Sequence, residues 1–245
     1  MAFSRLDQEL VSRNLVESRE LGKRLILAGK VTVNGHVVDK ASDKVRIDDK
    51  IKIKEAPKYV SRGGFKLEEA LHIFSINPHD LICLDIGSST GGFTDCLLQH
   101  GARKVHAYDA GTNQLSWKIR SDPRVLSREK LNCRYLTKKD IDDEIELIVI
   151  DVSFISLTKI LPAAYDIGSL NCSIVTLIKP QFELSRDEVS KGGIVKDPEL
   201  HQKSVSKIVN YATTELQLNH VGTTNSPITG SGGNVEFLAH FIKTA

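Results

Sequence analysis

The sequence predicts an α/β fold in which helices cover a mostly parallel sheet, preceded by a small α+β module. From residue 81 onward, short apolar runs alternate with helix-like stretches, an order typical of parallel sheets. A glycine-rich turn directly follows the first of these runs. The first sixty residues instead place two helix-like stretches before short alternating apolar runs. We therefore expect two domains, residues 1–57 and 58–245, joined by a linker around Pro57 in the stretch EAPK.

The composition is that of an ordinary globular protein, with 40% hydrophobic and 26% charged residues. It contains no long apolar run typical of a membrane span and no basic-then-apolar leader for export. Four scattered cysteines form no disulfide framework, so we expect reduced thiols and a cytoplasmic protein. Cysteine and histidine residues have no metal-ligand spacing, so we expect no metal site.

The net charge of +2 is unevenly distributed along the chain. Residues 1–60 carry thirteen Lys and Arg against nine Asp and Glu, whereas the remainder carries twenty against twenty-two. A basic module beside a nearly neutral domain suggests a polyanionic partner for the module. A solvated charged face would give the same excess, so charge alone does not decide between these interpretations.

The N-terminal module is expected to begin with two helices. Ser4 and Asp7 resemble a capping box at the start of the first helix. Ser18 is expected to cap the second helix, and Gly29 to end it.

A small sheet is expected after these helices. In KVTVNGHVV, alternating valines flank Asn34 and Gly35, the strongest short signal for a β-hairpin. In VRIDDKIKIK, apolar residues alternate on either side of an Asp-Asp turn.

Basic side chains decorate both predicted helices. Arg19 and Lys23 lie four residues apart and share a face, while Arg5 and Arg13 belong to the first helix. The pattern RLDQELV…SRELGKRLILAGKVTVNG…VRIDDKIKI resembles the RNA-binding domain named for ribosomal small-subunit protein four. This resemblance implies that these four basic residues contact structured RNA. The alternative is an ordinary α+β module with a charged face.

Four strand-like runs define the larger domain, and each ends in a polar turn: ICLDIG, KVHAYDAG, IELIVIDVSF and SIVTLIKP. Helix-like stretches such as TDCLLQHG and HQKSVSKIVNYATTEL accompany them. Ligands of such sheets bind beyond the carboxyl ends of the strands.

The glycine turn in LDIGSSTGGFTD lets a ligand lie against backbone at the start of a helix, which we expect near Thr94. Its spacing differs from that of dinucleotide-binding turns, and it lacks the Lys-Ser/Thr of a P-loop. The turn resembles the first motif of S-adenosylmethionine-dependent methyltransferases, which implies that cofactor. Asp85 would face a cationic group, and Asp109, about twenty residues further on, would accept hydrogen bonds from both ribose hydroxyls.

The residues predicted to bind S-adenosylmethionine are therefore Asp85, Gly87, Ser88, Gly91, Gly92, Phe93 and Asp109. The alternative for Gly91 and Gly92 is that they only permit close packing of helix and strand. Phe93 and Trp117 could stack on a base, but we favour packing for both.

Four ionisable residues are expected to meet at one edge of the sheet. Asp151 and Lys179 end two strands, Lys66 lies in the helix-like SRGGFKLEEAL, and Glu236 begins the run NVEFLAHFI. If that run is the antiparallel strand usual in methyltransferases, its beginning lies at the same edge. Each residue alone could equally form an ordinary salt bridge.

This set suits a ribose 2′-hydroxyl, a weak acid whose proton needs an acceptor. A lysine is neutral near pH 7 only if burial or another cation lowers its pKa. We assign Lys179 as the base and Lys66 as its positioning partner, with Asp151 and Glu236 orienting the amines. Methylation of an adenine amine or a cytosine carbon is disfavoured, because the expected Pro-Pro-aromatic motif and the crevice cysteine are missing.

The resemblance extends over the whole chain. The motifs that carry it are YVSRGGFKL, LDIGSSTGGFTD, NQLSWKIRSDPRV, DVSFISLTKILP, LIKPQFE, KGGIVKDPELH and GNVEF, which together resemble the TlyA family, also called haemolysin A. Its catalytic domain is similar to the FtsJ-type ribose methyltransferases. The resemblance implies a Rossmann-like class I methyltransferase sheet. It also implies that Lys66, Asp151, Lys179 and Glu236 are the catalytic set. Arg62, in the loop before Lys66, could contact RNA phosphate or cap the linker, and we favour contact with RNA.

The implied activity is 2′-O-methylation of cytidine in ribosomal RNA, in the 23S and possibly the 16S molecule. The expected partner is ribosomal RNA or a ribosomal subunit, not a membrane, and the sequence does not indicate an oligomeric state. A non-catalytic RNA-binding or ribosome-assembly factor remains an alternative. A membrane-lytic protein, suggested by the family's older name, is disfavoured because the chain has no apolar 18-mer.

Overall fold

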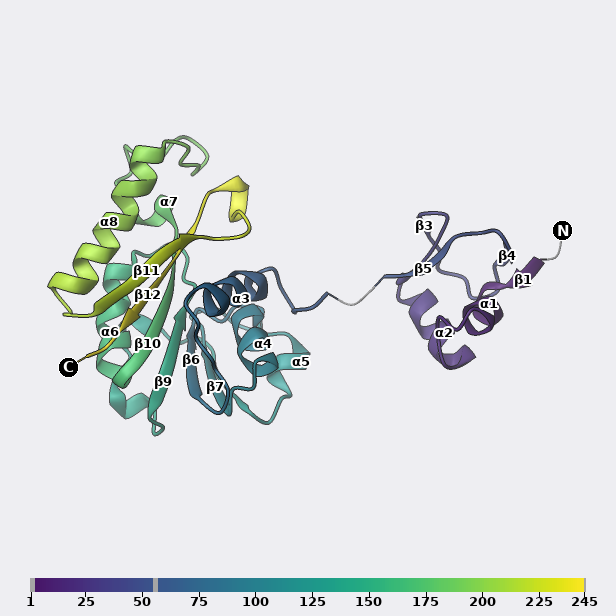
Figure 1. Cartoon of the computed structure of the whole chain (residues 1–245), viewed down its shortest axis with the longest axis horizontal. Coiled ribbons are helices and arrows are strands. Elements are labelled where there is room, and N and C mark those ends of the chain that lie inside the picture. The colour runs from purple at the N-terminus through teal and green to yellow at the C-terminus, as the bar shows by residue number, and fades with distance from the viewer. Residues whose placement is uncertain (1–2, 55–56, 245) are drawn as a thin grey trace. The chain divides into compact units, whose positions relative to one another are not determined.

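The computed structural model describes residues 3–54 and 57–244, which form two compact units, Met1–Lys58 and Tyr59–Ala245 (Figure 1). Residues 55 and 56 of the expected linker EAPK lie outside the described residues.

The N-terminal unit packs two helices on two small sheets. Strands β1 and β4 pair antiparallel, and a three-stranded sheet has the order β3-β2-β5. Its elements are β1 (Phe3–Arg5), α1 (Leu6–Ser12), α2 (Arg19–Leu27), β2 (Val31–Val33), β3 (His36–Val37), β4 (Lys44–Arg46) and β5 (Ile51–Ile53). Its core contains Leu6, Leu10, Val16, Ile26, Val31, Val45 and Ile51.

Two sequence signals in this unit are confirmed. The Ser18 hydroxyl accepts a hydrogen bond from Leu21 N at 3.2 Å, and the chain leaves α2 through Gly29 in the left-handed region. Asn34 and Gly35 both have positive φ and join β2 to β3 as a hairpin.

The predicted start of the first helix is wrong. Ser4 does not cap α1; it lies in β1 opposite Val45, and its hydroxyl donates to the carboxylate of Glu9. Pairing with β4 keeps this stretch extended, so α1 begins at Leu6 after Arg5, which makes no side-chain cap. In the stretch around the Asp-Asp turn, β4 and β5 join different sheets.

A buried carboxylate links the two helices of this unit. Asp7 is fully buried, and it accepts hydrogen bonds from Arg5 Nε at 3.0 Å and Arg19 Nη2 at 2.8 Å. The bond from Arg5, together with that from Arg19, outweighs the effect of burial and lowers the pKa of Asp7 to about 2. The two guanidinium groups remain partly exposed.

The larger unit contains one seven-stranded sheet of order β11-β12-β10-β9-β6-β7-β8, which confirms the predicted α/β class. Strand β12 runs antiparallel to β10 and β11, and the other neighbours are parallel. The strands are β6 (Ile82–Ile86), β7 (Lys104–Tyr108), β8 (Val125–Arg128), β9 (Ile145–Ile150), β10 (Gly168–Ile178), β11 (Asn219–Asn225) and β12 (Phe237–Ile242). The helices are α3 (Gly63–Ile73), α4 (Gly92–Gln99), α5 (Trp117–Arg120), α6 (Leu161–Ile167), α7 (Pro180–Glu183) and α8 (Pro198–Thr214), with short 3-10 turns at Cys133–Tyr135, Lys138–Asp140, Leu157–Lys159 and Ser231–Gly233.

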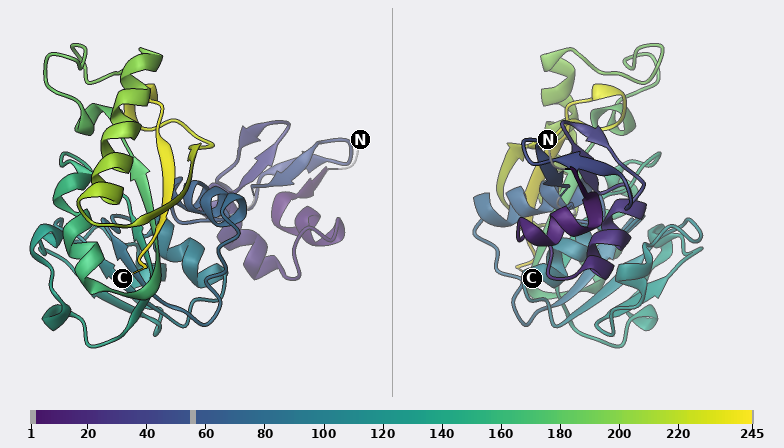
Figure 2. Two further views of the ribbon diagram at one scale, coloured as in Figure 1. Left: turned by 60° about the vertical axis from the view of Figure 1, so that its left-hand side comes forward. Right: turned by 90° about the vertical axis from the view of Figure 1, so that its right-hand side faces the viewer.

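Two apolar cores cover the two faces of this sheet. One includes Leu84, Ile148 and Ile174 together with residues of α6 and α8, and the other includes Cys83, Leu147 and Val175 together with residues of α3 and α4. The left view of Figure 2 shows α8 and α3 on opposite sides of the sheet. Because both faces are buried, the central strands read as nearly continuous apolar runs such as IELIVI.

We expect Asp7→Asn to weaken the N-terminal unit near neutral pH. The folded pKa of about 2 lies below the value of about 3.9 for an unfolded aspartate, so the ionised carboxylate stabilises the unit above about pH 4. This stabilisation is lost as the pH falls from about 4 toward about 2. Hydrogen exchange in the N-terminal unit of the full chain should therefore be faster in the variant at neutral pH. If the variant exchanges faster than the unaltered protein by the same factor down to about pH 2, this account is contradicted.

Candidate active site

A glycine turn after β6 forms the centre of the site. Gly87 has φ +86°, and a Cβ there would lie 2.4 Å from the carbonyl oxygen of Asp151. Gly91 has φ +94°, and a Cβ would lie 2.9 Å from Leu115 Cδ1. Neither position therefore tolerates a side chain without movement of its neighbours. Helix α4 begins at Gly92, two residues before the predicted start at Thr94.

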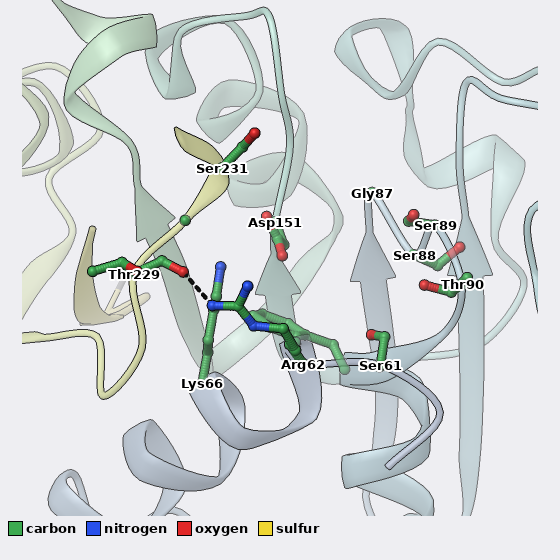
Figure 3. A pocket seen from close by; sticks show the side chains of 14 residues that line it. Ser61, Arg62, Lys66, Gly87, Ser88, Ser89, Thr90, Asp151, Thr229 and Ser231 are labelled. Carbon is green, nitrogen blue, oxygen red and sulfur yellow. Dashed lines mark hydrogen bonds between the residues drawn. The ribbon is translucent and has the colours of Figure 1, made fainter. Parts of the chain in front are cut away.

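Two adjoining cavities lie along this turn, at the carboxyl ends of the strands. The smaller, of about 180 Å³, is lined by the turn together with Ser61, Arg62 and Lys66. The larger, of about 500 Å³, is lined by Asp109, Asn132 and Phe154 among others. Gly87, Ser89 and Asp151 belong to the walls of both. Figure 3 shows the smaller cavity, with Lys66 and Asp151 reaching it from different elements.

Asp109 lies where the sequence predicts, directly after β7. Its Oδ2 accepts a hydrogen bond from Ser89 N at 2.8 Å, and its Oδ1 accepts one from Gly111 N at 2.6 Å. The carboxylate thus ties the glycine turn to the loop after β7 and presents negative charge to the larger cavity.

The four ionisable residues come together as two lysine–carboxylate pairs. Lys66 Nζ lies 2.5 Å from Glu236 Oε2, and Lys179 Nζ lies 2.5 Å from Asp151 Oδ1. Lys66, Lys179 and Glu236 are only 8%, 9% and 3% exposed. Lys179 also donates to Ser153 Oγ at 2.9 Å, a contact that sequence reasoning missed although Ser153 stands two residues after Asp151.

Strand register explains this convergence. Strands β9 and β10 are parallel and end beside each other, so Asp151 and Lys179 leave the sheet at one edge. Strand β12 runs the other way, with Phe237 opposite Ile178, so Glu236 precedes it at the same edge. Lys66 comes from the second turn of α3, which packs against α4.

Asp85 does not occupy the predicted place. Its side chain is fully buried beneath the turn and lines neither cavity. Its Oδ2 accepts a hydrogen bond from Thr94 Oγ1 at 2.6 Å, while Oδ1 has no hydrogen-bond partner among the described residues. Burial raises the pKa of Asp85 to about 7. In this structure Asp85 orders the first turn of α4 and does not face either cavity.

The other predicted cofactor residues divide into two groups. Ser88, Gly92 and Phe93 line the smaller cavity together with Gly87, although Phe93 also packs in the core. Gly91 lines neither cavity. A glycine is needed there because a Cβ would press on Leu115 and on Ile119 of α5. Trp117 is 79% exposed and also lies outside both cavities, so the packing that we favoured for it is wrong.

Some of the predicted RNA-binding side chains are held by other groups of the protein, and others are exposed. Arg13 donates to the backbone oxygens of Arg46, Ile47 and Asp49 and to Glu9, so it serves the fold of the N-terminal unit. Lys23 is exposed.

Arg62 is exposed as well. It donates to the carbonyl oxygen of Thr229 at 2.6 Å, from one wall of the smaller cavity to the other (Figure 3). Sequence reasoning missed the Thr229–Ser231 segment as part of the site, because only the fold brings it beside Arg62, far away in the chain.

The model of the FtsJ-like methyltransferase family matches residues 59–243, nearly the whole of the unit that carries this site. The chain belongs to the FtsJ-like methyltransferases. The model of the S4 domain matches residues 4–51 of the N-terminal unit.

Several proteins resemble this FtsJ-like chain over most of its length. Hemolysin A of Brachyspira hyodysenteriae is 49% identical, with 97% of this chain and 99% of that protein covered. The 16S/23S rRNA (cytidine-2′-O)-methyltransferase TlyA of Mycobacterium tuberculosis strain H37Rv is 43% identical, with 96% and 88% covered. The crystal structure of a putative hemolysin from Lactococcus lactis has a TM-score of 0.75 at 51% identity. The match covers 77% of this chain and 90% of the Lactococcus lactis chain.

A more distant structure shares only the fold. The O-methyltransferase of Bacillus cereus, solved with SAH, has a TM-score of 0.51 at 17% identity, covering 77% of this chain and 84% of that one. Over the described parts of this FtsJ-like chain, no helix has both the length and the apolar character needed to cross a membrane.

We expect Gly87→Ala to destabilise the catalytic unit more than Gly233→Ala. Both glycines have nearly the same positive φ, +86° and +87°, so both variants bear the same backbone strain. Only the alanine at position 87 would also press on the Asp151 carbonyl, because nothing lies within 4 Å of the Cβ position at Gly233. Thermal unfolding should show the larger fall in Tm for Gly87→Ala. Equal falls in Tm for the two variants would contradict the close approach of Gly87 to the Asp151 carbonyl.

Proposed function

We propose that this protein transfers a methyl group from S-adenosylmethionine to a ribose 2′-hydroxyl of ribosomal RNA. The observation that carries the proposal is the pair of lysine–carboxylate contacts, Lys66–Glu236 and Lys179–Asp151, beside the glycine turn. Membership of the FtsJ-like methyltransferases supports the reaction class. The substrate named for the relative TlyA supports cytidine in 16S or 23S ribosomal RNA.

The cavities fit the proposed cofactor. The larger one combines the Asp109 carboxylate with an amide, Asn132, and the apolar wall of Val152 and Phe154, a lining suited to a ribose and a base. The smaller one offers bare backbone at Gly87, where a Cβ would collide with the carbonyl group of Asp151. When bound, S-adenosylmethionine supplies an electrophilic methyl carbon.

The catalytic residues would manage the proton of the attacking hydroxyl. In the transfer, the bond from ribose oxygen to methyl forms as the bond from sulfur to methyl breaks, and the hydroxyl proton passes to an acceptor on the protein. Lys66 lines the smaller cavity directly, whereas Lys179 contacts Asp151, which lines both cavities, and Ser153, which lines the larger one. The assignment of Lys179 as the base stays a prediction, and the carboxylates hold both amines in place.

The N-terminal unit is the proposed RNA anchor. Its match to the S4 domain supports this role, as does the exposed Lys23. Arg5 and Arg19 are held side by side by one buried carboxylate and keep exposed donors that suit RNA phosphates. A cytoplasmic location is part of the proposal, since ribosomal RNA is found there and none of the four cysteines, all within the described residues, is in a disulfide.

We expect Lys66→Ala to lower methyl transfer to ribosomal RNA by about 100-fold or more, the usual size of a general acid–base contribution. The matched control is Lys203→Ala, which removes a lysine paired to Glu188 at the same 2.5 Å but on the surface. Transfer of labelled methyl groups, measured for both variants and the unaltered protein, should fall only for Lys66→Ala. A folded Lys66→Ala variant with normal activity would defeat the assignment.

We expect Asp109→Ala to weaken S-adenosylmethionine binding by about 10- to 100-fold, because hydrogen bonds to a charged group contribute about 1.5–3 kcal/mol. Titration calorimetry would measure this, with Asp122→Ala as a control that removes a carboxylate paired to Arg124 outside both cavities. If folded Asp109→Ala binds S-adenosylmethionine with unchanged affinity, Asp109 does not hold the ribose of the cofactor.

A further inference from the structure

Two irregular segments, far apart in the chain, meet behind the smaller cavity. One is the loop between α7 and α8, which contains Gly193 and Val195. The other joins β11 to β12 and contributes Thr229, Gly230 and Ser231 to the cavity wall. Asn234 lies at their junction and is only 4% exposed.

The side chain of Asn234 binds both segments. Its Nδ2 donates to Gly193 O at 2.9 Å and to Ser231 O at 3.2 Å, and its Oδ1 accepts from Val195 N at 2.9 Å. Both ends of the amide are thus satisfied by backbone groups. Among the described residues, nothing lies within 4 Å of the Cβ position at Gly193, so no neighbouring group packs against the loop on that side.

The backbone of Asn234 continues this link toward the catalytic residues. Its carbonyl oxygen accepts a hydrogen bond from Gly230 N at 2.8 Å, which closes the turn 230–234. A Cβ at Gly230 would lie only 2.0 Å from Glu236 Oε1, so the Glu236 carboxylate rests directly against the Gly230 backbone. The other carboxylate oxygen of Glu236 holds Lys66.

We propose that Asn234 is a positioning residue for methyl transfer, which fixes Glu236, and through it Lys66, by closing the wall of the cavity. The inference rests on the proposed function. The residue type matters because the site needs two donors and one acceptor from a short side chain, which only an asparagine amide provides there. An aspartate would direct a carboxylate oxygen at the carbonyls of Gly193 and Ser231.

The test is steady-state methyl transfer to ribosomal RNA by full-length Asn234→Asp and Asn234→Ala, together with their affinity for S-adenosylmethionine. We expect kcat to fall by about 10- to 100-fold, since a small misplacement of catalytic groups has effects of this size. Affinity for S-adenosylmethionine should stay within about twofold, because Asp109 and the larger cavity are built by other segments. Variants that fold and keep the normal kcat would overturn the proposal.

A control separates positioning from general stability. Ser169→Ala removes a hydrogen bond from Ser169 Oγ to Ile145 O, 2.9 Å long, at the start of β10, the opposite end of that strand from Lys179. It should lower Tm without lowering kcat. If the Asn234 variants lose kcat and cofactor affinity together, in proportion to their fall in Tm, the role is structural and the proposal is wrong.

A second variant keeps the test decisive if the Asn234 variants do not fold. Gly230→Ala displaces the Glu236 carboxylate from the same side, so it should show the same fall in kcat. Normal kcat in Gly230→Ala would overturn the link from the turn to Glu236. No methyl transfer by the unaltered protein would instead overturn the proposed function itself, and this inference with it.

Discussion

Two lysine–carboxylate pairs, largely removed from water at one edge of the sheet, are the constraint on which the site depends. Charges in such a place lose hydration, and breaking a buried pair by removing one partner costs about 3–5 kcal/mol. The fold must therefore bring the partners together accurately. It does so with strand ends: Asp151 and Lys179 leave parallel neighbours, and Glu236 enters the antiparallel strand beside them. The site is in this sense a property of the sheet topology.

The glycine turn places the cavities against these pairs. Gly87 brings the backbone after β6 to within van der Waals distance of the chain at Asp151, so the cavity beside the turn is bounded by one of the paired carboxylates. Asp109 then secures the turn from the other side through Ser89 N. The cavity wall and the two lysine–carboxylate pairs consequently belong to one edge of the sheet, an arrangement that favours precise alignment of reacting groups.

The sequence predicts features that follow from local pattern or from topology. Ser18, Gly29 and the Asn34-Gly35 turn act within a few residues, and the structure confirms them. The meeting of Asp151 with Lys179 follows from the rule that parallel strands end at one edge. Both kinds of inference need no knowledge of side-chain packing.

What the sequence misses depends on contacts between distant residues. Ser4 lies in a strand because residues 44–46 pair with it, and no local signal carries that pairing. Asp85 was expected to face a cationic group, yet its side chain lies beneath the glycine turn and accepts a hydrogen bond from Thr94. From the sequence alone Arg13 is a candidate surface cation. In the fold it donates hydrogen bonds to the carbonyl oxygens of Arg46 and Ile47.

The most direct test of the account is to locate the transferred methyl group. Purified protein would be incubated with labelled S-adenosylmethionine and with ribosomal RNA from cells that lack this gene, and the digested nucleosides would be separated. The account predicts label in 2′-O-methylated nucleosides, with cytidine as the base. Label on a base, or none in the RNA, would contradict it.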